Sequence, residues 1–241
     1  HAFTAYQDRF LQKNPERPEL FESYHPEYFA VGRTGGPHER QFCYTNRAFI
    51  EQVAQDARDY FDGKPLKGEQ IALGDYFAIV PLDNANWCQC EECTRQLAID
   101  KDNIRGEHFN CGTATHYLWT FINNVAKEVK KTHPNKKISA LAYHVYAYMP
   151  EDMTLEDNIS VAPCLHPRNY WAPKMKENEV DYYKKWIEES KKSGRPVYLW
   201  NYLCFPTERG LVQNFHVFPG FSIHEVAGQI KMYAKDKVRG I

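Results

Sequence analysis

The stretch YFAIVPLDNANWCQCEEC, which spans Tyr76–Cys93, decides how the rest of the chain is interpreted. It begins with an apolar run, Tyr76–Val80, whose length and β-branched and aromatic content predict a buried strand. Asp83 follows after Pro81 and Leu82, and residues just past the carboxyl ends of buried strands carry the chemistry of α/β barrels and open sheets. A C-x-C-x2-C cluster comes next. The stretch therefore predicts a candidate catalytic acid beside most of a metal site.

The composition is that of an ordinary globular domain, with 241 residues, 43% of them hydrophobic and 25% charged, and a formal net charge of -1. A near-neutral charge argues against nucleic acid or an anionic membrane as a partner. No apolar run approaches the roughly 18 residues that span a bilayer. Because the chain begins at His1 without methionine and ends at Ile241 as if entering a strand, we expect one domain over residues 1–241, trimmed from a longer multidomain protein.

Segments with strand and helix character mostly alternate along the chain. The strands are expected at 41–44, 76–82, 137–146, 159–162 and 196–202, and the main helices at 47–61, 113–132, 179–192 and 224–237. Because the strands are apolar throughout, the pattern favours a parallel sheet covered by helices. We expect a (β/α)8 TIM-like barrel, incomplete in this chain, with a doubly wound open sheet as the alternative. The absence of a glycine-rich phosphate loop disfavours nucleotide use.

The cysteine cluster predicts a structural zinc site. Cys88, Cys90 and Cys93 supply three thiolates, whereas tetrahedral zinc takes four ligands. Cys43 is the preferred fourth ligand, because its predicted strand would neighbour 76–82 and adjacent strand ends lie about 5 Å apart. Four sulfurs leave no open position for water, so the site would be structural. The alternative ligands are Cys111 and a histidine such as His108, and the alternative states are a disulfide from Cys43 or free thiols.

The candidate catalytic residues are those that glycoside hydrolysis needs. Such reactions usually use two carboxyl groups that flank the scissile bond. Asp83 is the first choice for the acid, because partial burial after an apolar strand would favour its protonated form. Glu208 is the best-placed second carboxylate, and His144 is a further catalytic candidate. A capping role beside the metal loop is the alternative for Asp83.

Aromatic and polar residues at predicted strand ends suggest a sugar-binding groove. Aromatic residues make up 15% of the chain, and their flat faces suit sugar rings. Arg168 with His166 would suit the carboxylate of a uronic or sialic acid. Packing in the core is the alternative for each residue. The candidate substrate-binding residues are His1, Tyr143, Tyr146, His166, Arg168, Trp200, Asn201 and Tyr202.

Through several motifs in a fixed order, the chain resembles a bacterial domain of unknown function. That domain occurs in large secreted or lipid-anchored proteins of carbohydrate-degrading bacteria, and it looks like a relative of the α-glucuronidase and β-hexosaminidase barrels. The resemblance covers nearly the whole chain. It rests on His1-Ala-Phe-Thr, His25-Pro-Glu-Tyr-Phe-Ala, Gln41-Phe-Cys-Tyr-Thr-Asn, Asp83 with Trp87-Cys-Gln-Cys-Glu-Glu-Cys, Phe121-Ile-Asn-Asn-Val-Ala and Leu199-Trp-Asn-Tyr.

The resemblance implies a secreted, periplasmic or cell-surface protein that acts on a glycan, with an acid after the fourth strand. The cysteine pattern is also similar to that of certain zinc-containing β-galactosidases, in which a cysteine lies about 45 residues upstream of the cluster, and Cys43 precedes Cys88 by 45 residues. The hexosaminidase-like enzymes use an Asp-Glu pair, however, where this chain has Asp83-Asn84. We therefore expect a glycoside hydrolase for uronic, sialic or N-acetylated sugars, with a non-catalytic carbohydrate-binding barrel or a zinc-stapled scaffold as alternatives.

Overall fold

Strand β2 (Tyr76–Ile79) forms where the sequence predicted it, with Phe77 and Ile79 buried. A computed structural model describes residues 3–32, 41–102, 111–203 and 222–241. These residues belong to two compact units. The first contains His1–Asp102, Thr113–Ala140 and Pro150–Ser160, and the second contains Asn103–Gly112, Leu141–Met149 and Val161–Ile241. The single domain expected over residues 1–241 stays a prediction.

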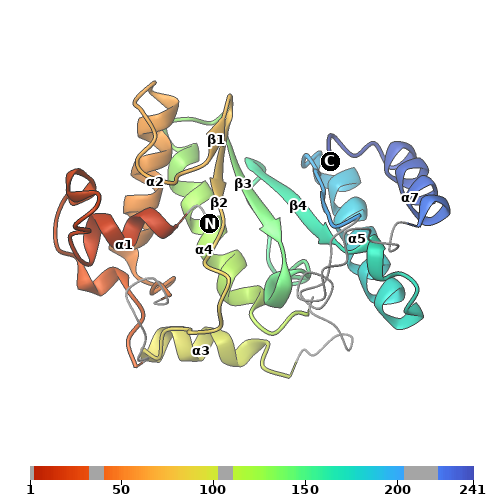
Figure 1. The fold of residues 1–241 in the computed structure, drawn as a ribbon, viewed down its shortest axis with the longest axis horizontal. Coiled ribbons are helices and arrows are strands. Elements are labelled where there is room, and N and C mark those ends of the chain that lie inside the picture. The colour runs from red at the N-terminus through yellow and green to blue at the C-terminus, as the bar shows by residue number, and fades with distance from the viewer. Residues whose placement is uncertain (1–2, 33–40, 103–110, 204–221) are drawn as a thin grey trace. The chain divides into compact units, whose positions relative to one another are not determined.

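The elements follow one another along the chain as drawn in Figure 1. The helices are α1 (Thr4–Phe10), α2 (Arg47–Phe61), α3 (Glu91–Ile99), α4 (Thr115–Lys130), α5 (Pro173–Ser193) and α7 (Ile223–Lys235). The strands are β1 (Ala72–Leu73), β2, β3 (Lys137–Ala142), β4 (Ile159–Leu165) and β5 (Trp200–Asn201). Short 3-10 helices cover Pro18–Leu20, Pro26–Tyr28, His144–Tyr146 and Pro167–Asn169.

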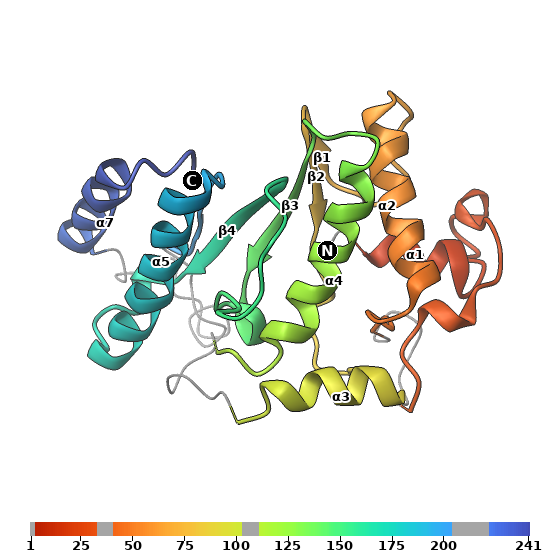
Figure 2. The ribbon, with the colours of Figure 1, turned by 180° about the vertical axis from the view of Figure 1, so that it is seen from behind.

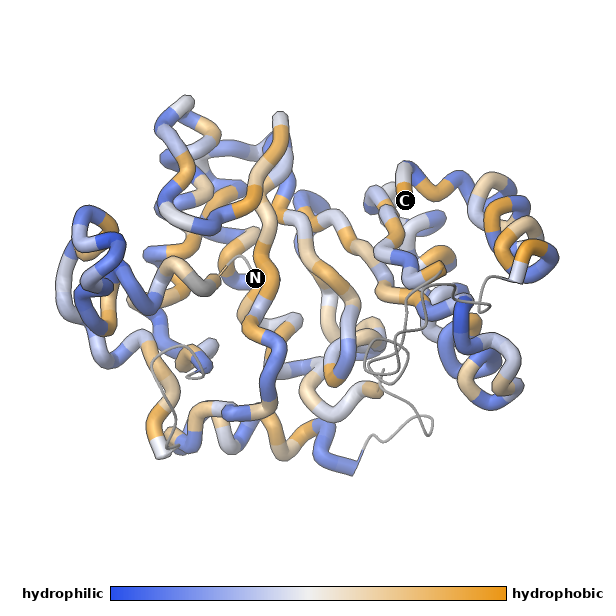
Figure 3. Tube along the Cα trace, viewed as in Figure 1, coloured by the Kyte–Doolittle hydropathy of each residue, from blue (hydrophilic) through white to orange (hydrophobic). Residues whose placement is uncertain are grey.

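The described strands form a mixed sheet in the order β1-β2-β3-β4-β5. β2 pairs with β3 in parallel, and β4 pairs with β5 in parallel. β1 pairs with β2 antiparallel, because Gly74, with a φ of 57°, turns the chain back between them. In Figure 3 the tube along β2 is mainly hydrophobic, as expected for a strand with a covered face.

The prediction of a (β/α)8 TIM-like barrel is wrong. The described residues contain five strands in one mixed sheet, and one of them is antiparallel. The edge of β2 where a barrel would place another parallel strand is occupied by the β1 hairpin. Residues 41–44, expected to be that strand, instead make one antiparallel bridge, between Phe42 and Phe29.

Helices α2 and α4 form an aromatic core in the first unit. The Asn46 side chain caps α2 by accepting a 2.9 Å hydrogen bond from the Phe49 N–H. The Phe49 ring stacks on Phe121 of α4, with centroids 5.7 Å apart and planes at 8°. Figure 2 shows the two helices side by side. Their helical spacing of apolar residues predicted both helices, and the observed ends lie within two residues of the expected ones.

A buried charge network joins α1 to α2. The Arg9 side chain is fully buried and donates to both oxygens of Asp56, at 2.6 and 3.0 Å. Asp56 also accepts hydrogen bonds from the Tyr6 hydroxyl at 2.7 Å and the Gln70 amide at 2.8 Å. Burial of a charge is tolerated when it is paired and hydrogen-bonded in this way.

A second polar link joins α3, α4 and the segment that precedes β4, within the first unit. Asp100, which ends α3, accepts a 2.6 Å hydrogen bond from the backbone N–H of His116 and lies 2.8 Å from His116 Nδ1. The other ring nitrogen, Nε2, contacts Asp152. Burial opposes protonation, but the hydrogen bonds to Asp152 and Asp100 raise the pKa of His116 above its ordinary value.

The second unit is built on β4, whose residues are almost all buried. Helix α5 begins at Pro173, earlier than predicted, and ends at Ser193; the next residue, Gly194, has a φ of 76°, the left-handed conformation that glycine adopts freely. Trp186 of α5 is fully buried, and its Nε1 donates to the carbonyl of Ala147 at 2.9 Å. The strand predicted at 196–202 is reduced to β5 and a bridge from Val197 to Val161.

Among the described residues, no helix combines the length and the hydropathy that crossing a membrane would require.

Candidate metal centre

The four cysteines predicted as ligands, Cys43, Cys88, Cys90 and Cys93, lie together in the first unit. Their Sγ atoms all fall within 4.8 Å of one another. Cys43 Sγ is 3.7 Å from both Cys90 Sγ and Cys93 Sγ. Sulfurs bound at about 2.3 Å in a tetrahedron lie about 3.8 Å apart. The cluster could therefore hold one metal ion with little rearrangement.

The structure does not support a disulfide within this group. None of the four forms a disulfide, and neither do Cys111 and Cys164 among the described residues. Cys111, the alternative fourth ligand, lies in the second unit and is not a member of the four-cysteine group. His108 lies outside the described residues. The preference for Cys43 over Cys111 is thus supported by proximity.

Cys43 reaches the cluster by a route that was not predicted from the sequence. It does not lie on a parallel strand beside β2. Residues on both sides of Phe42 instead pair antiparallel with an earlier segment: the Cys43 N–H donates to the Tyr28 carbonyl at 2.9 Å, and the Ala30 N–H donates to the Gln41 carbonyl at 2.8 Å. This short ribbon places the thiol opposite the cysteine loop.

Helix α3 supplies two of the four thiols, and this helix was missed, because 91–99 follows the cysteine loop and has a weak apolar stripe. Cys90 caps the N-terminus of α3, and Cys93 lies in its first turn. Figure 1 shows the chain leaving β2 and running to α3. A helix N-terminus carries a partial positive charge, which favours thiolates there. The cue available in the sequence was Glu91-Glu92, since acidic residues favour a first turn.

Further donors surround the sulfurs. The Tyr117 hydroxyl of α4 donates to Cys93 Sγ at 3.2 Å, and the Val31 backbone N–H donates to Cys88 Sγ at 3.5 Å. The Thr45 hydroxyl lies 3.1 Å from Cys93 Sγ. Hydrogen bonds of this kind orient metal ligands and stabilise their charge. Because burial raises the pKa of Tyr117 far above its ordinary value, this phenol stays a donor.

The thiols strongly influence one another's ionisation. The hydrogen bond from Cys43 lowers the pKa of Cys88, whereas its hydrogen bond to Cys88 raises the pKa of Cys43 to about 11. The pKa of Cys93 is also raised, mainly by its hydrogen bond to Cys43. Without a bound cation, the ionisation of one thiol in the cluster thus makes the ionisation of the next less favourable. A divalent cation would remove this opposition and allow all four thiols to bind as thiolates.

Asp83 lies in the loop that connects β2 to the cysteines. The amide of the buried Gln41 fixes this loop by donating to the carbonyls of Leu82 and Asn84, at 2.6 and 2.8 Å. Tyr44 in turn donates its hydroxyl to Gln41 Oε1 at 2.8 Å. Asp83 itself is exposed. The partial burial expected for a general acid is therefore not supplied by the described residues.

Five of the predicted sugar-binding residues lie on β5 or just after β4 and β5, in the second unit. The His166 ring stacks on Tyr202, with centroids 4.8 Å apart and planes at 8°. Arg168 lies over the same tyrosine ring at 5.3 Å. Trp200 and Asn201 form β5; Asn201 is half-buried, while Trp200 is half-exposed at 52%.

Glu179, which was not predicted as a site residue, lies behind His166. Glu179 is fully buried on α5 and accepts hydrogen bonds from the backbone N–H of His166 at 2.6 Å and from its Nδ1 at 2.7 Å. This pair fixes the orientation of the imidazole. The available signal was a carboxylate on the apolar face of a helix, three residues before Tyr182.

The remaining candidates are only partly described. β3 ends at Ala142, so Tyr143, His144 and Tyr146 lie in and before a 3-10 helix and not on the strand predicted to reach Tyr146. The Tyr143 ring contacts the rings of His144 and Tyr146, at 5.9 and 6.4 Å between centroids. His1 and Glu208 lie outside the described residues. Asp83 belongs to the first unit and the other described candidates to the second.

A model of one protein family matches residues 11–241, which is nearly the whole chain. No curated protein and no solved structure matches significantly. The family is described as a domain of unknown function, DUF4838, and the chain belongs to it.

Proposed function

We propose that this chain is a carbohydrate-active domain in which a zinc ion braces the loop that presents Asp83 to a glycan. The observation that carries the proposal is the position of Asp83 between two fixed points. The residues on either side of it, Leu82 and Asn84, accept hydrogen bonds from the Gln41 amide at their carbonyls. Five residues after it, Cys88 enters the four-thiol cluster. Preorganisation of this kind is what a catalytic carboxyl requires.

Zinc is the proposed ion because four thiolates in tetrahedral spacing suit zinc or iron, and zinc needs no redox partner. Cys43, Cys88, Cys90 and Cys93 would hold it. With four sulfurs bound it has no free position for substrate or water, so it stabilises the loop and takes no part in the reaction.

Asp83 is the proposed general acid for glycoside hydrolysis. Its exposure leaves it accessible to a substrate, and occupation of the site by a sugar would supply the desolvation that favours a protonated carboxyl. The substrate we propose is an acidic or N-acetylated glycan.

The proposal is tested by screening the protein against a glycan panel and comparing Asp83→Asn with Asp75→Asn. Asp75 is a matched control, because it is also exposed and lies at the opposite end of β2. We expect Asp83→Asn to lower kcat by about 100-fold or more with the fold unchanged, as for loss of a general acid. Equal turnover in both variants would reject Asp83 as the acid.

A non-catalytic carbohydrate-binding function is favoured by one specific observation. Tyr202 and Arg168, which lies over its ring, are both half-buried, and the buried His166 stacks on Tyr202; this aromatic and cationic pair could bind a sugar without cleaving it. Glycan binding that is lost in Tyr202→Ala, with no turnover by the wild-type protein, would establish this second function.

A further inference from the structure

The second unit contains a hollow at the amino end of its strands. It has a volume of about 430 Å³ and is lined by residues from the C-terminal ends of α5 and α7 and from the segments that follow them. The lining residue Val197 precedes Tyr202, one of the candidate sugar-binding residues, by five positions. In extended chain this separation corresponds to roughly 16 Å between the hollow and Tyr202. The lining residues are Ser190, Lys191, Gly194, Arg195, Val197, Lys235, Asp236, Lys237 and Arg239.

The lining carries an excess of positive charge. Five of its residues are cationic and one, Asp236, is anionic. Lys191 approaches Asp236 at 3.6 Å, and Arg195 is paired outside the lining with Glu189 at 2.9 Å. Two helix C-termini contribute a partial negative charge of about -0.5 each, which leaves a surplus of roughly +2. The surplus is notable in a chain whose formal net charge is -1.

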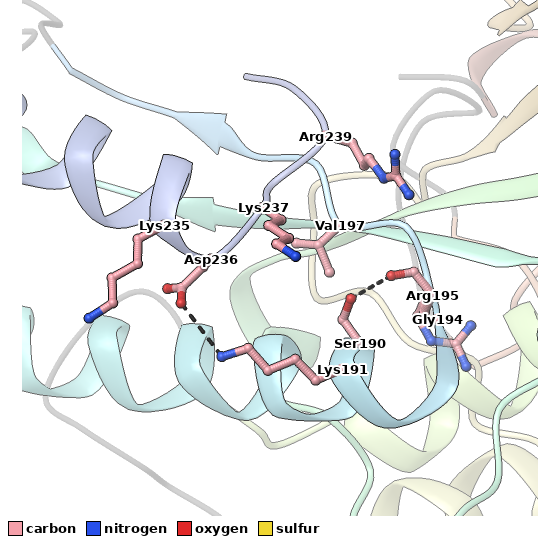
Figure 4. A pocket seen from close by; sticks show the side chains of 9 residues that line it. All are labelled: Ser190, Lys191, Gly194, Arg195, Val197, Lys235, Asp236, Lys237 and Arg239. Carbon is pink, nitrogen blue, oxygen red and sulfur yellow. Dashed lines mark hydrogen bonds and ion pairs between the residues drawn. The ribbon is translucent and has the colours of Figure 1, made fainter.

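Figure 4 shows how these groups are arranged. Lys191 extends from α5 across to Asp236, and Lys237 lies in the centre beside Val197. Lys235 and Arg239 lie on either side of them. The long, flexible lysine side chains can turn their amines toward an anion placed between them.

Lys237 occupies a position where glycine is the usual residue. Its φ is 59°, in the left-handed region. The N–H of Lys237 donates to Ala234 and that of Val238 to Tyr233, which is the hydrogen-bond pattern of a Schellman motif at the end of α7. The chain thus has a cation where backbone conformation alone would favour a residue without a side chain.

We propose that this hollow binds a tetrahedral oxyanion, namely a phosphate or sulfate group, either free or esterified to a sugar. The surplus of roughly +2 matches the charge of free sulfate, of hydrogen phosphate or of a phosphate monoester, and it exceeds the single charge of a sulfate ester. The volume is large enough for the group and part of a sugar ring. The proposal does not depend on hydrolytic activity or on Asp83.

The test is calorimetric titration of the purified protein with inorganic phosphate, inorganic sulfate, glucose 6-phosphate and glucose 6-sulfate, with ionic strength held constant by potassium chloride. We expect saturable binding of at least one of these anions. Tighter binding of an ester than of the free ion would identify a modified sugar as the ligand. The reverse order would identify the free ion.

The decisive variant is Lys237→Gly, which removes a cation and suits the backbone. It should bind the anion about ten-fold more weakly while its Tm stays equal to or above that of the wild type. Lys231→Gln on α7 and Lys192→Gln on α5 are matched controls outside the lining, and their affinity should stay within two-fold.

Two results would overturn the proposal. One is the absence of saturable binding beyond the effect of potassium chloride, and the other is an equal loss of affinity in Lys237→Gly and the two controls. Preferential binding of a single-stranded oligonucleotide, equally weakened by all three substitutions, would likewise show a diffuse positive surface and no oxyanion site.

Discussion

Replacement of Gln41 by methionine tests whether the Asp83 loop is held by hydrogen bonds. Gln41 is fully buried, and its amide donates to the carbonyls of Leu82 and Asn84 while its oxygen accepts from Tyr44. Methionine has a similar length and no branching, so it fills the space without making these bonds. The substitution therefore removes three hydrogen bonds with a small change in packing.

The expected loss of unfolding free energy depends on which hydrogen bonds the partners of Gln41 keep after the substitution. The Leu82 carbonyl keeps a 2.9 Å hydrogen bond from the Asn84 N–H, so its loss is that of one net bond and not of full desolvation. Three net bonds at about 1 kcal/mol each give a destabilisation of about 3 kcal/mol. For a chain of this size the Tm should fall by roughly 6–12 °C.

The assay is urea unfolding monitored by tryptophan fluorescence, combined with a double-mutant cycle. Tyr44→Phe should cost about 1 kcal/mol in the wild type and close to nothing in Gln41→Met, because their shared hydrogen bond is already lost. A loss below about 0.5 kcal/mol for Gln41→Met, or additive effects of the two substitutions, would refute this account of the loop.

Three further predictions concern stability and metal affinity. The pKa of His116 is raised in the folded state, so its protonated form stabilises the fold at low pH. This contribution is complete below the pKa of the unfolded state and is lost as pH rises through the pKa of the folded state. The free energy of unfolding should therefore fall more between pH 6 and 9 in the wild type than in His116→Gln. Tyr117→Phe should weaken metal affinity by about ten-fold in a chelator competition, because Cys93 loses its hydroxyl donor; unchanged affinity would contradict this role. Asp56→Ala leaves a buried guanidinium without its main counter-ion and should cost about 3–5 kcal/mol in urea unfolding, whereas a cost below 1 kcal/mol would show that the charge is solvated.

Local periodicity was sufficient to predict α2, α4, β2 and the last helix, α7, because each carries an apolar pattern of its own. The barrel was wrongly predicted, because apolar runs do not specify which edges of a strand are paired. The turn at Gly74 lets a two-residue strand take one edge of β2. The pairing of Phe42 with Phe29 depends on a segment that has no strand periodicity.

The cysteine cluster was predictable because cysteine spacing constrains chemistry directly. Cys43 was correctly grouped with Cys88, Cys90 and Cys93, although an antiparallel ribbon and not a parallel strand brings it there. Gln41 and Glu179 could not be assigned roles from sequence. Each acts through tertiary hydrogen bonds to residues far away in the chain or in another element.

The measurement that tests the central claim most directly is X-ray absorption spectroscopy of the protein purified from zinc-supplemented medium, together with its metal content. We predict one zinc per chain with four sulfur neighbours at about 2.3 Å, and loss of one sulfur neighbour in Cys43→Ser. Substoichiometric metal in the wild type, or a coordination shell that Cys43→Ser leaves unchanged, would contradict the four-cysteine centre.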